Sequence, residues 1–265
     1  MIHTFFRRLI NAFERRWNPG DIINDLQITH LVGRGSYGTT YSVKLPNGEE
    51  AILKRIRPYK KLFSNHVQYV LNERNALEIL SHPHFPEFLI AGEYKGIPYL
   101  VMEKMKGRTF EDLIFREGKK YSEEESLKVG LQLVKLVNFI HQKGYVHRDL
   151  RIPNILLDKG TIQIIDFGLA CEMSAEPGIR HAHKDYMRDR SKKSDFYAVG
   201  HFLLFLLYSS YEPVGKREKS WDKELSIHQD TIAIIRRLLQ IDEAYQDASE
   251  LIEEITKVIH ILQAR

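Results

Sequence analysis

The spacing of apolar residues changes along the chain, and this change constrains the fold more than any other feature. Between Leu26 and Met102, apart from a run with helical spacing at residues 66–80, apolar and polar residues alternate in short runs separated by turn residues, which indicates antiparallel strands. After Gly107, the apolar residues mostly recur at helical spacing. The sequence therefore predicts an α+β chain with a small antiparallel-sheet lobe followed by a larger helical lobe.

Turn and capping residues locate the predicted elements more closely. The expected strands span residues 26–32, 39–44, 50–57, 88–94, 97–102, 155–157 and 161–165, and the expected helices span residues 66–80, 122–143, 194–208, 231–241 and 248–262. We expect the first lobe to cover residues 25–103 and the second lobe to cover residues 107–262, with a short connection between them.

Composition excludes several classes of protein. The chain has 265 residues, of which 43% are hydrophobic, so it is too apolar to be disordered and long enough to form a sizeable core. Its single cysteine excludes an internal disulfide and favours a reducing compartment, which predicts a cytoplasmic location. The net charge of +4 is spread out and gives no case for a nucleic-acid partner. The longest apolar run, 199–208, is too short for a membrane span of about 20 residues, so we expect a buried helix there.

Residues 1–20 stand apart as a basic amphipathic helix. Its apolar positions are Ile2, Phe5, Phe6, Leu9, Ile10, Phe13 and Trp17, and its arginines are Arg7, Arg8, Arg15 and Arg16. The sequence Asn18-Pro19-Gly20 ends this helix. Two interpretations remain open: the apolar stripe packs on the rest of the chain, or the helix makes weak contact with an anionic membrane surface.

A glycine-rich loop and a lysine mark the first lobe. The loop from Gly33 to Gly38 follows the pattern GxGxxG, but it joins two strands instead of opening a helix, which excludes the dinucleotide-binding arrangement. Glycines at a hairpin tip let backbone N–H groups approach phosphate oxygens. Lys54 lies on the third predicted strand, where it is either exposed to solvent or paired with an acidic residue. Glu73 is the expected partner, and Glu78 is the competing one.

The second lobe contains two short motifs in a fixed order. His147-Arg148-Asp149 is followed by Asn154, and Asp166-Phe167-Gly168 comes after a predicted strand pair. Together with the glycine loop and Lys54, this arrangement resembles the eukaryotic-like (bacterial-type) serine/threonine protein kinase family. The resemblance covers residues 25–262 and implies a two-lobed protein-kinase-like fold that uses ATP and Mg²⁺.

The resemblance also implies roles for individual residues. Asp149 would orient the attacking hydroxyl, Lys54 would hold the α- and β-phosphates, and Asn154 and Asp166 would bind magnesium. Arg151 lies where serine/threonine members usually carry a lysine that meets the γ-phosphate, so we count Asp149, Arg151 and Lys54 as catalytic. The expected nucleotide-binding residues are Val32, Gly33, Arg34, Gly35, Ser36, Tyr37, Gly38, Thr39, Thr40, Lys54, Glu73, Met102, Glu103 and Met105, with Met102 at the gatekeeper position.

The stretch from Asp166 to Asp195 departs from the family. It is short and lacks the usual Ala-Pro-Glu, and Gln246 lies where the arginine partner of that glutamate is expected. The stretch is also basic, and we interpret it as a solvated loop; the alternative is a docking surface for an acidic substrate or a phosphate. Cys171 is interpreted as a packing residue, and His181 with its neighbour His183 as surface residues instead of metal ligands.

These observations predict a function and leave two alternatives. We expect an ATP-dependent protein kinase that transfers the γ-phosphate to a serine or threonine hydroxyl of a protein substrate, with autophosphorylation as a further reaction. The alternatives are a non-catalytic pseudokinase scaffold and a small-molecule hydroxyl kinase of the same superfamily. The identity of the substrate and the oligomeric state stay open.

Overall fold

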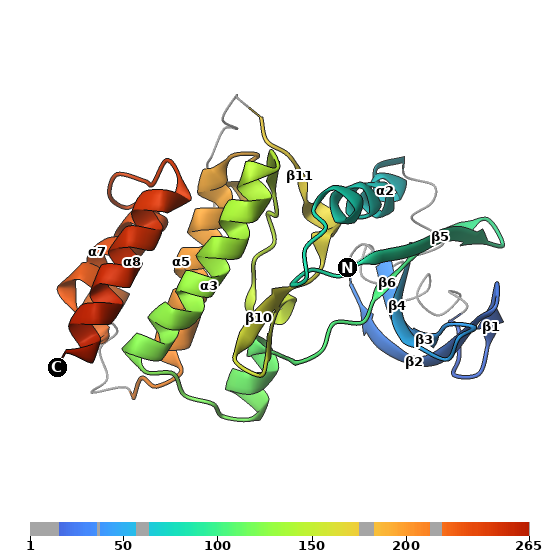
Figure 1. The fold of residues 1–265 in the computed structure, drawn as a ribbon, viewed down its shortest axis with the longest axis horizontal. Coiled ribbons are helices and arrows are strands. Elements are labelled where there is room, and N and C mark those ends of the chain that lie inside the picture. Colours follow the sequence, from blue (N-terminus) through green and yellow to red (C-terminus); the bar gives the residue numbers. More distant parts are fainter. Residues whose placement is uncertain (1–15, 36–37, 57–63, 175–182, 213–218, 265) are drawn as a thin grey trace, which may run out of the picture. The chain divides into compact units, whose positions relative to one another are not determined.

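The computed structural model describes residues 16–35, 38–56, 64–174, 183–212 and 219–264. Most of the predicted N-terminal helix and two predicted nucleotide-binding residues, Ser36 and Tyr37, therefore lie outside the described residues. The chain divides into two compact units, residues 1–105 and residues 106–265, which are described separately (Figure 1).

The first unit is built on a six-stranded antiparallel sheet. Its strands are β1 (Ile22–Ile23), β2 (Leu26–Arg34), β3 (Gly38–Lys44), β4 (Glu50–Ile56), β5 (Phe88–Tyr94) and β6 (Ile97–Glu103), in the order β1-β2-β3-β4-β6-β5. One helix, α2 (Ser64–Ile79), packs against β4, β5 and β6. The predicted strands and helix of this lobe are confirmed to within a few residues. Strand β1 was not predicted, because two residues are too few to show a period.

The core of the first unit includes an aromatic residue from the N-terminal segment. Trp17 is buried, with its ring centroid 5.4 Å from that of Tyr41 and 5.9 Å from that of Tyr94. The guanidinium of Arg55, itself only 2% exposed, lies 4.4 Å from the centre of the Trp17 ring. Trp17, the last apolar residue of the predicted N-terminal helix, therefore packs on the rest of the chain. This agrees, for that residue, with the packing interpretation given above.

The second unit consists mainly of helices. Helix α3 (Glu123–Gln142) packs against α5 (Lys192–Tyr208) and α8 (Ala248–Gln263), and α7 (Gln229–Leu238) packs against both α5 and α8 (Figure 1). The apolar run 199–208 lies in α5, where Phe202, Leu203 and Leu206 are buried, so the prediction of a core helix is confirmed. In the described parts of the chain, no helix is long and apolar enough to cross a membrane.

Short elements hold the loops of the second unit. The predicted strand pair is confirmed as β9 (Ile155–Asp158) and β10 (Thr161–Ile164), and β7 (Arg108–Thr109) joins β9 to complete a three-stranded sheet. Strand β8 (Tyr145–Val146) pairs with β11 (Cys171–Glu172). Of the short helices, α6 covers Trp221–Glu224, η3 covers Ile152–Asn154, η4 covers Phe167–Leu169, and η2, a π-helical turn, covers Asp112–Arg116.

The prediction of a solvated loop is wrong for part of the basic stretch. Residues 183–188 form helix α4 (His183–Arg188), in which Met187 is buried. Asp189, which follows this helix, is also buried and accepts a hydrogen bond from the Ser191 hydroxyl at 2.8 Å. Met187 packs in the lobe and so holds the helix against it. The interpretation as a solvated loop considered only the charged residues of the stretch.

The loop around Gln246, between α7 and α8, contains a cluster other than the glutamate–arginine pair that is usual in the family. Gln246 is exposed, and its amide donates to the Ala244 carbonyl at 3.1 Å. The neighbouring Arg237 lies 3.9 Å from the ring centre of Tyr245 and forms an ion pair with Glu254 at 2.7 Å. This cluster of residues from α7, the following loop and α8 stabilises the loop without the arginine expected there.

Candidate active site

The glycine loop is shaped by hydrogen bonds and by the need for space. The Gly35 N–H donates to the Gly38 carbonyl at 3.0 Å, which narrows the end of the β2–β3 hairpin. A Cβ atom on Gly38 would lie 2.6 Å from the Arg55 carbonyl oxygen, so packing within the chain requires glycine there. At Gly33 a Cβ would meet nothing, and at Gly35 it would barely touch the loop. Since a Cβ would fit at both positions without a clash, there is open space beside the loop where phosphate oxygens would approach the backbone.

Lys54 is paired as predicted. Its Nζ lies 2.5 Å from Oε1 of Glu73 on α2, and the side chain of Glu73 is 5% exposed. Glu78, the competing partner, instead pairs with Arg74 on the surface of the same helix at 3.0 Å. An ammonium group and a carboxylate that are both mostly removed from water hold each other in position, because either one alone would be costly to bury.

The other predicted nucleotide-binding residues lie on both faces of the sheet. Thr40 lies opposite Lys54 in the β3–β4 ladder, so the two side chains share a face. Thr39 lies opposite Arg55, and it lines a small hollow with Arg34 and Trp17 on the other face.

The end of β6 carries the predicted gatekeeper. Met102 is buried and pairs with Ile52 in the β4–β6 ladder. Glu103 ends the strand, and its N–H donates to the Glu87 carbonyl at 2.8 Å. Val32 is exposed on β2, and Met105 follows the strand as the last residue of the first unit.

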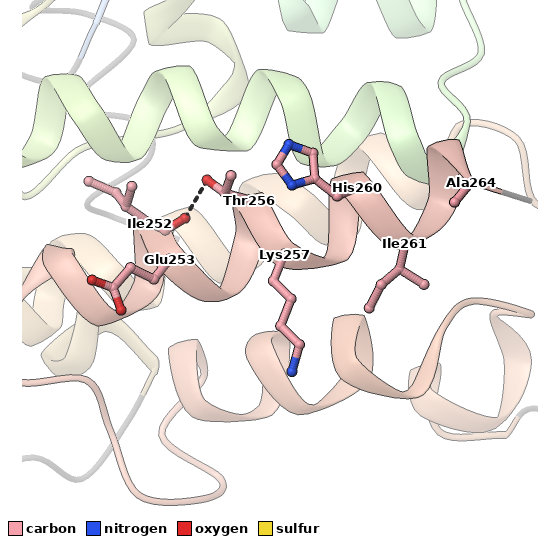
Figure 2. Close-up of a pocket in the computed structure, with 7 residues that line it drawn as sticks. All are labelled: Ile252, Glu253, Thr256, Lys257, His260, Ile261 and Ala264. Carbon is pink, nitrogen blue, oxygen red and sulfur yellow. Dashed lines mark hydrogen bonds between the residues drawn. The ribbon is translucent and has the colours of Figure 1, made fainter.

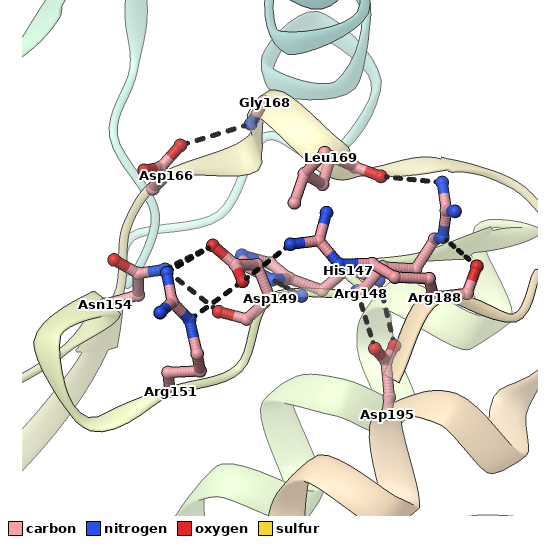
Figure 3. Close-up of polar contacts among 10 residues, drawn as sticks. All are labelled: His147, Arg148, Asp149, Arg151, Asn154, Asp166, Gly168, Leu169, Arg188 and Asp195. Atoms are coloured by element: carbon pink, nitrogen blue, oxygen red, sulfur yellow. Dashed lines mark hydrogen bonds and ion pairs between the residues drawn. The ribbon is translucent and has the colours of Figure 1, made fainter. Parts of the chain in front are cut away.

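In the second unit, Asp149 is held by its own loop (Figure 3). The Arg151 guanidinium donates from Nε to Oδ1 at 2.9 Å and from Nη2 to Oδ2 at 3.2 Å. The Asn154 amide donates to Oδ2 and to the Asp149 carbonyl, both at 2.9 Å. Two-point contact by a planar guanidinium fixes the orientation of the carboxylate.

The residues predicted to bind magnesium present oxygen atoms of the right kind. Because both hydrogen bonds of the Asn154 amide nitrogen go to Asp149, the amide oxygen points away from that residue (Figure 3). Asp166 adopts a left-handed backbone conformation (φ 66°), which is uncommon for a residue with a side chain and concentrates at functional sites. Amide and carboxylate oxygens are the ligands that Mg²⁺ prefers. The donor set therefore fits a magnesium ion that completes its shell with phosphates and water.

No larger metal site is visible in the parts of the chain that the structure describes. These parts contain no group of three or more His, Cys, Asp and Glu residues arranged to hold a metal ion. His181 lies outside the described residues, so its proposed surface location is not tested.

Asp195, which the sequence analysis did not place in the site, holds the backbone of the segment that leads to Asp149. It is fully buried in the first turn of α5 and accepts the backbone N–H groups of His147 at 2.9 Å and Arg148 at 2.8 Å. Its Oδ2 also lies 2.9 Å from Nε2 of His141. Burial alone would raise the pKa of Asp195, but these hydrogen bonds and the nearby imidazoles hold it below its ordinary value. A carboxylate at the start of an apolar helix was the sequence signal for this role.

Arg148 links the beginning and the end of the short stretch that follows Asp166. Its Nε donates to the Arg188 carbonyl at 2.8 Å, and its Nη1 lies 3.4 Å from the Leu169 carbonyl. The thiol of Cys171 lies 3.5 Å from the same nitrogen, so Cys171 contacts the arginine in addition to packing. Arg188 returns toward the loop of residues 147–154, called the catalytic loop below, and its Nη2 lies 3.8 Å from Asp149 Oδ1. This last contact joins residues far apart in the sequence and was not predicted.

Comparison with known proteins identifies the family. Residues 26–264 match the family described as the protein kinase domain. The chain belongs to the protein kinase family. This kinase is 30% identical over 249 residues to YbdM of Bacillus subtilis, a probable serine/threonine-protein kinase, and the match covers 93% of this chain and 94% of YbdM.

A plant relative and a solved structure extend the comparison. The kinase is 27% identical to the serine/threonine-protein kinase AtPK2/AtPK19 of Arabidopsis thaliana, and the match covers 76% of this chain but 45% of the plant protein. The crystal structure of the Mycobacterium tuberculosis PknI kinase domain aligns with a TM-score of 0.70 at 18% identity, covering 91% of this chain and 99% of that domain. The two-lobed kinase fold expected from the sequence is confirmed.

A hollow on α8 of this kinase contains none of the predicted site residues. It measures about 600 Å³ and lies along the outer face of the helix, where Ile252, Lys257 and His260 line it (Figure 2). The side chains there carry both signs of charge and lie on a single helix, so the hollow does not belong to the active site.

Proposed function

We propose that this kinase transfers the γ-phosphate of ATP to a serine or threonine hydroxyl of a protein substrate, and that it also phosphorylates itself. The observation that carries the proposal is the carboxylate of Asp149, held by the guanidinium of Arg151 and the amide of Asn154. A carboxylate fixed in this way has the chemistry needed to orient a hydroxyl and accept its proton.

Residues of each unit contribute to this proposal. The open backbone at Gly33 and Gly35 suits phosphate oxygens, and Lys54, held by Glu73, supplies a positive charge for them. Asn154 and Asp166 would hold Mg²⁺, which neutralises phosphate charge when it is bound. Met102, Glu103 and Met105 would border the base, and Val32, Ser36, Tyr37, Gly38 and Thr40 are proposed to surround the rest of the nucleotide. Arg34 and Thr39 line a hollow on the face opposite Lys54, so these two residues would contribute their backbone only.

Arg151 has two partners in this proposal. In the structure its guanidinium binds the Asp149 carboxylate, and in the reaction it would also donate to the oxygens of the transferred phosphoryl group. The guanidinium has five N–H donors and Asp149 takes two of them, so donors remain for the phosphoryl oxygens.

A cytoplasmic location is part of the proposal, because one cysteine requires no oxidising compartment. Contact of residues 1–15 with a membrane surface remains the alternative to packing of that segment, and no nucleic-acid partner is proposed.

The test uses the full chain with Mg²⁺, ATP labelled at the γ-phosphate, and a generic basic protein as acceptor. We expect labelling of the acceptor and of the kinase itself, and loss of at least about 100-fold in rate for Asp149→Asn and Asp166→Ala. Asp158→Asn, at the end of β9, is the matched control and should retain the rate of the original protein.

Two outcomes would contradict the proposal. If neither a polypeptide nor a small hydroxyl compound is labelled, the chain is a pseudokinase scaffold. If no polypeptide is labelled while a small hydroxyl compound is, the chain is a small-molecule kinase.

A further inference from the structure

A pocket of about 480 Å³ opens in the second unit beside the catalytic loop. Residues of that loop, Ile152 and Pro153, line it together with Met187 of α4. The remaining walls include Phe115 of η2 and Phe205 of α5. Four separate elements therefore converge on one mostly apolar space, which Glu111, Arg151 and His201 also border.

The pocket has a buried floor and exposed walls. Ile152 and Met187 are buried, so the packing of the lobe holds the floor in place. Phe115 and Phe205, in contrast, are 66% and 45% exposed. Among the described residues of 106–265, the exposed large apolar side chains are Phe115, Phe205 and Ile241, so two of these three face the same pocket. Exposed aromatic rings gathered at one concave site indicate a surface that binds a partner.

Local backbone geometry supports this interpretation. Phe115 lies within the π-helical turn of η2. Such turns are rare in proteins overall, and many of those that occur lie at functional sites. The extra residue of such a turn changes the direction of the side chains that follow, and here the turn carries an aromatic ring that lines the pocket instead of packing in the core.

Arg151 connects the pocket to the carboxylate of Asp149. Arg151 lines the pocket, and its guanidinium binds both oxygens of Asp149. A chain seated in the pocket therefore lies within one arginine side chain of the carboxylate that would orient the acceptor hydroxyl. An extended chain advances about 3.3 Å per residue, so the residue in the pocket would lie about two to four positions from the acceptor.

We propose that this pocket binds a bulky apolar side chain of the protein substrate and thereby selects substrates that carry such a residue near the phosphorylated serine or threonine. The inference rests on the proposed function, since it names the substrate class of that same site. The volume accommodates one large side chain with its flanking backbone, and the aromatic walls would contact it on two sides.

The experiment measures phosphorylation of a set of peptides by the full chain. Each peptide has one serine, and a single leucine is moved through every position near it in an otherwise alanine- and glycine-containing background. We expect one spacing to raise kcat/KM about 10-fold or more over the alanine peptide, mainly through KM, because burial of one large apolar side chain is worth that much.

Two variants test the assignment of the pocket. Phe205→Ala and Phe115→Ala should each reduce the ratio of kcat/KM between the leucine and alanine peptides toward one. Phe115 is so exposed that its truncation leaves the core intact, which keeps the test valid if Phe205→Ala folds poorly. Ile241→Ala removes an exposed apolar side chain of the same lobe outside the pocket and should keep the ratio.

The results separate this inference from the function on which it rests. If peptides are phosphorylated but no spacing of leucine is preferred, or if both variants keep the preference, the pocket assignment is wrong and the protein kinase activity stands. If the original protein labels no peptide and no protein under any condition, the proposed function fails, and the pocket assignment fails with it.

Discussion

Glu73 and Glu78 show how the position of a single residue decides its role. Both lie on α2, but Glu73 pairs with Lys54 away from water, whereas Glu78 pairs with Arg74 where both side chains are more than 40% exposed. A charge pair shielded from water is worth much more than an exposed one. Spacing along the sequence allowed either glutamate to pair with Lys54. The structure decides for Glu73, because its side chain lies on the face of α2 that meets Lys54.

We predict that Glu73→Gln lowers kcat/KM for ATP by about 10- to 100-fold, because the Lys54 ammonium loses the charge-assisted hydrogen bond that positions it. Glu78→Gln makes the same chemical change on the same helix and should stay within about twofold of the original protein. Steady-state kinetics with varied ATP would measure both. Equal effects of the two substitutions would show that the pair does not position Lys54.

At the scale of elements, the first turn of α5 organises the catalytic loop. Asp195 accepts backbone N–H groups from the loop, and the buried ring of His147 lies 4.7 Å from that of Phe167. Burial lowers the pKa of His147 below its ordinary value, although nearby carboxylates oppose the shift. The folded protein therefore keeps this imidazole neutral where the unfolded chain has already bound a proton.

This arrangement predicts a loss of stability on mild acidification. The unfolded chain binds a proton at His147 near pH 6.5, so the free energy of unfolding should decrease as the pH falls below that value, by up to about 1.4 kcal/mol per pH unit. The low pKa of Asp195 acts in a different range, because its contribution is lost only as the pH falls below about 4.

The measurement is urea unfolding of the original protein and of His147→Phe between pH 7.5 and pH 5. The phenylalanine keeps the ring contact with Phe167 and removes the titrating group, so its curve should be flatter. Parallel curves would mean that His147 does not contribute to the acid sensitivity.

At the scale of the whole molecule, each of the two units has its own core. Trp17 belongs to the core of the first unit, where it packs with Tyr41, Leu53 and Val101. We predict that Trp17→Ala destabilises this unit by about 3 kcal/mol or more, because it removes a large buried side chain and leaves a cavity. Amide hydrogen exchange should become faster in β2, β3 and β4 and stay unchanged in α3 and α5.

Ile22→Ala is the control for this prediction. Ile22 lies close in sequence and is 67% exposed, so its truncation should leave exchange unaffected. Faster exchange in both units would show that the two cores are not independent in stability.

Local signals in the sequence predicted most of this kinase. Periodicity and turn residues located the main strands and helices, because each depends on neighbours within a few positions. The motifs around His147 and Asp166 named the catalytic loop for the same reason, since their spacing is a local property.

Contacts between distant segments were decided by the tertiary structure. The approach of Arg188 to Asp149, the burial of Trp17 and the gathering of Phe115 and Phe205 in one pocket join residues from separate elements. The sequence by itself determined the elements and the chemistry of their side chains. Only the packing of those elements decided which side chains meet, because burial and ion pairing depend on distances in space that spacing along the chain does not specify.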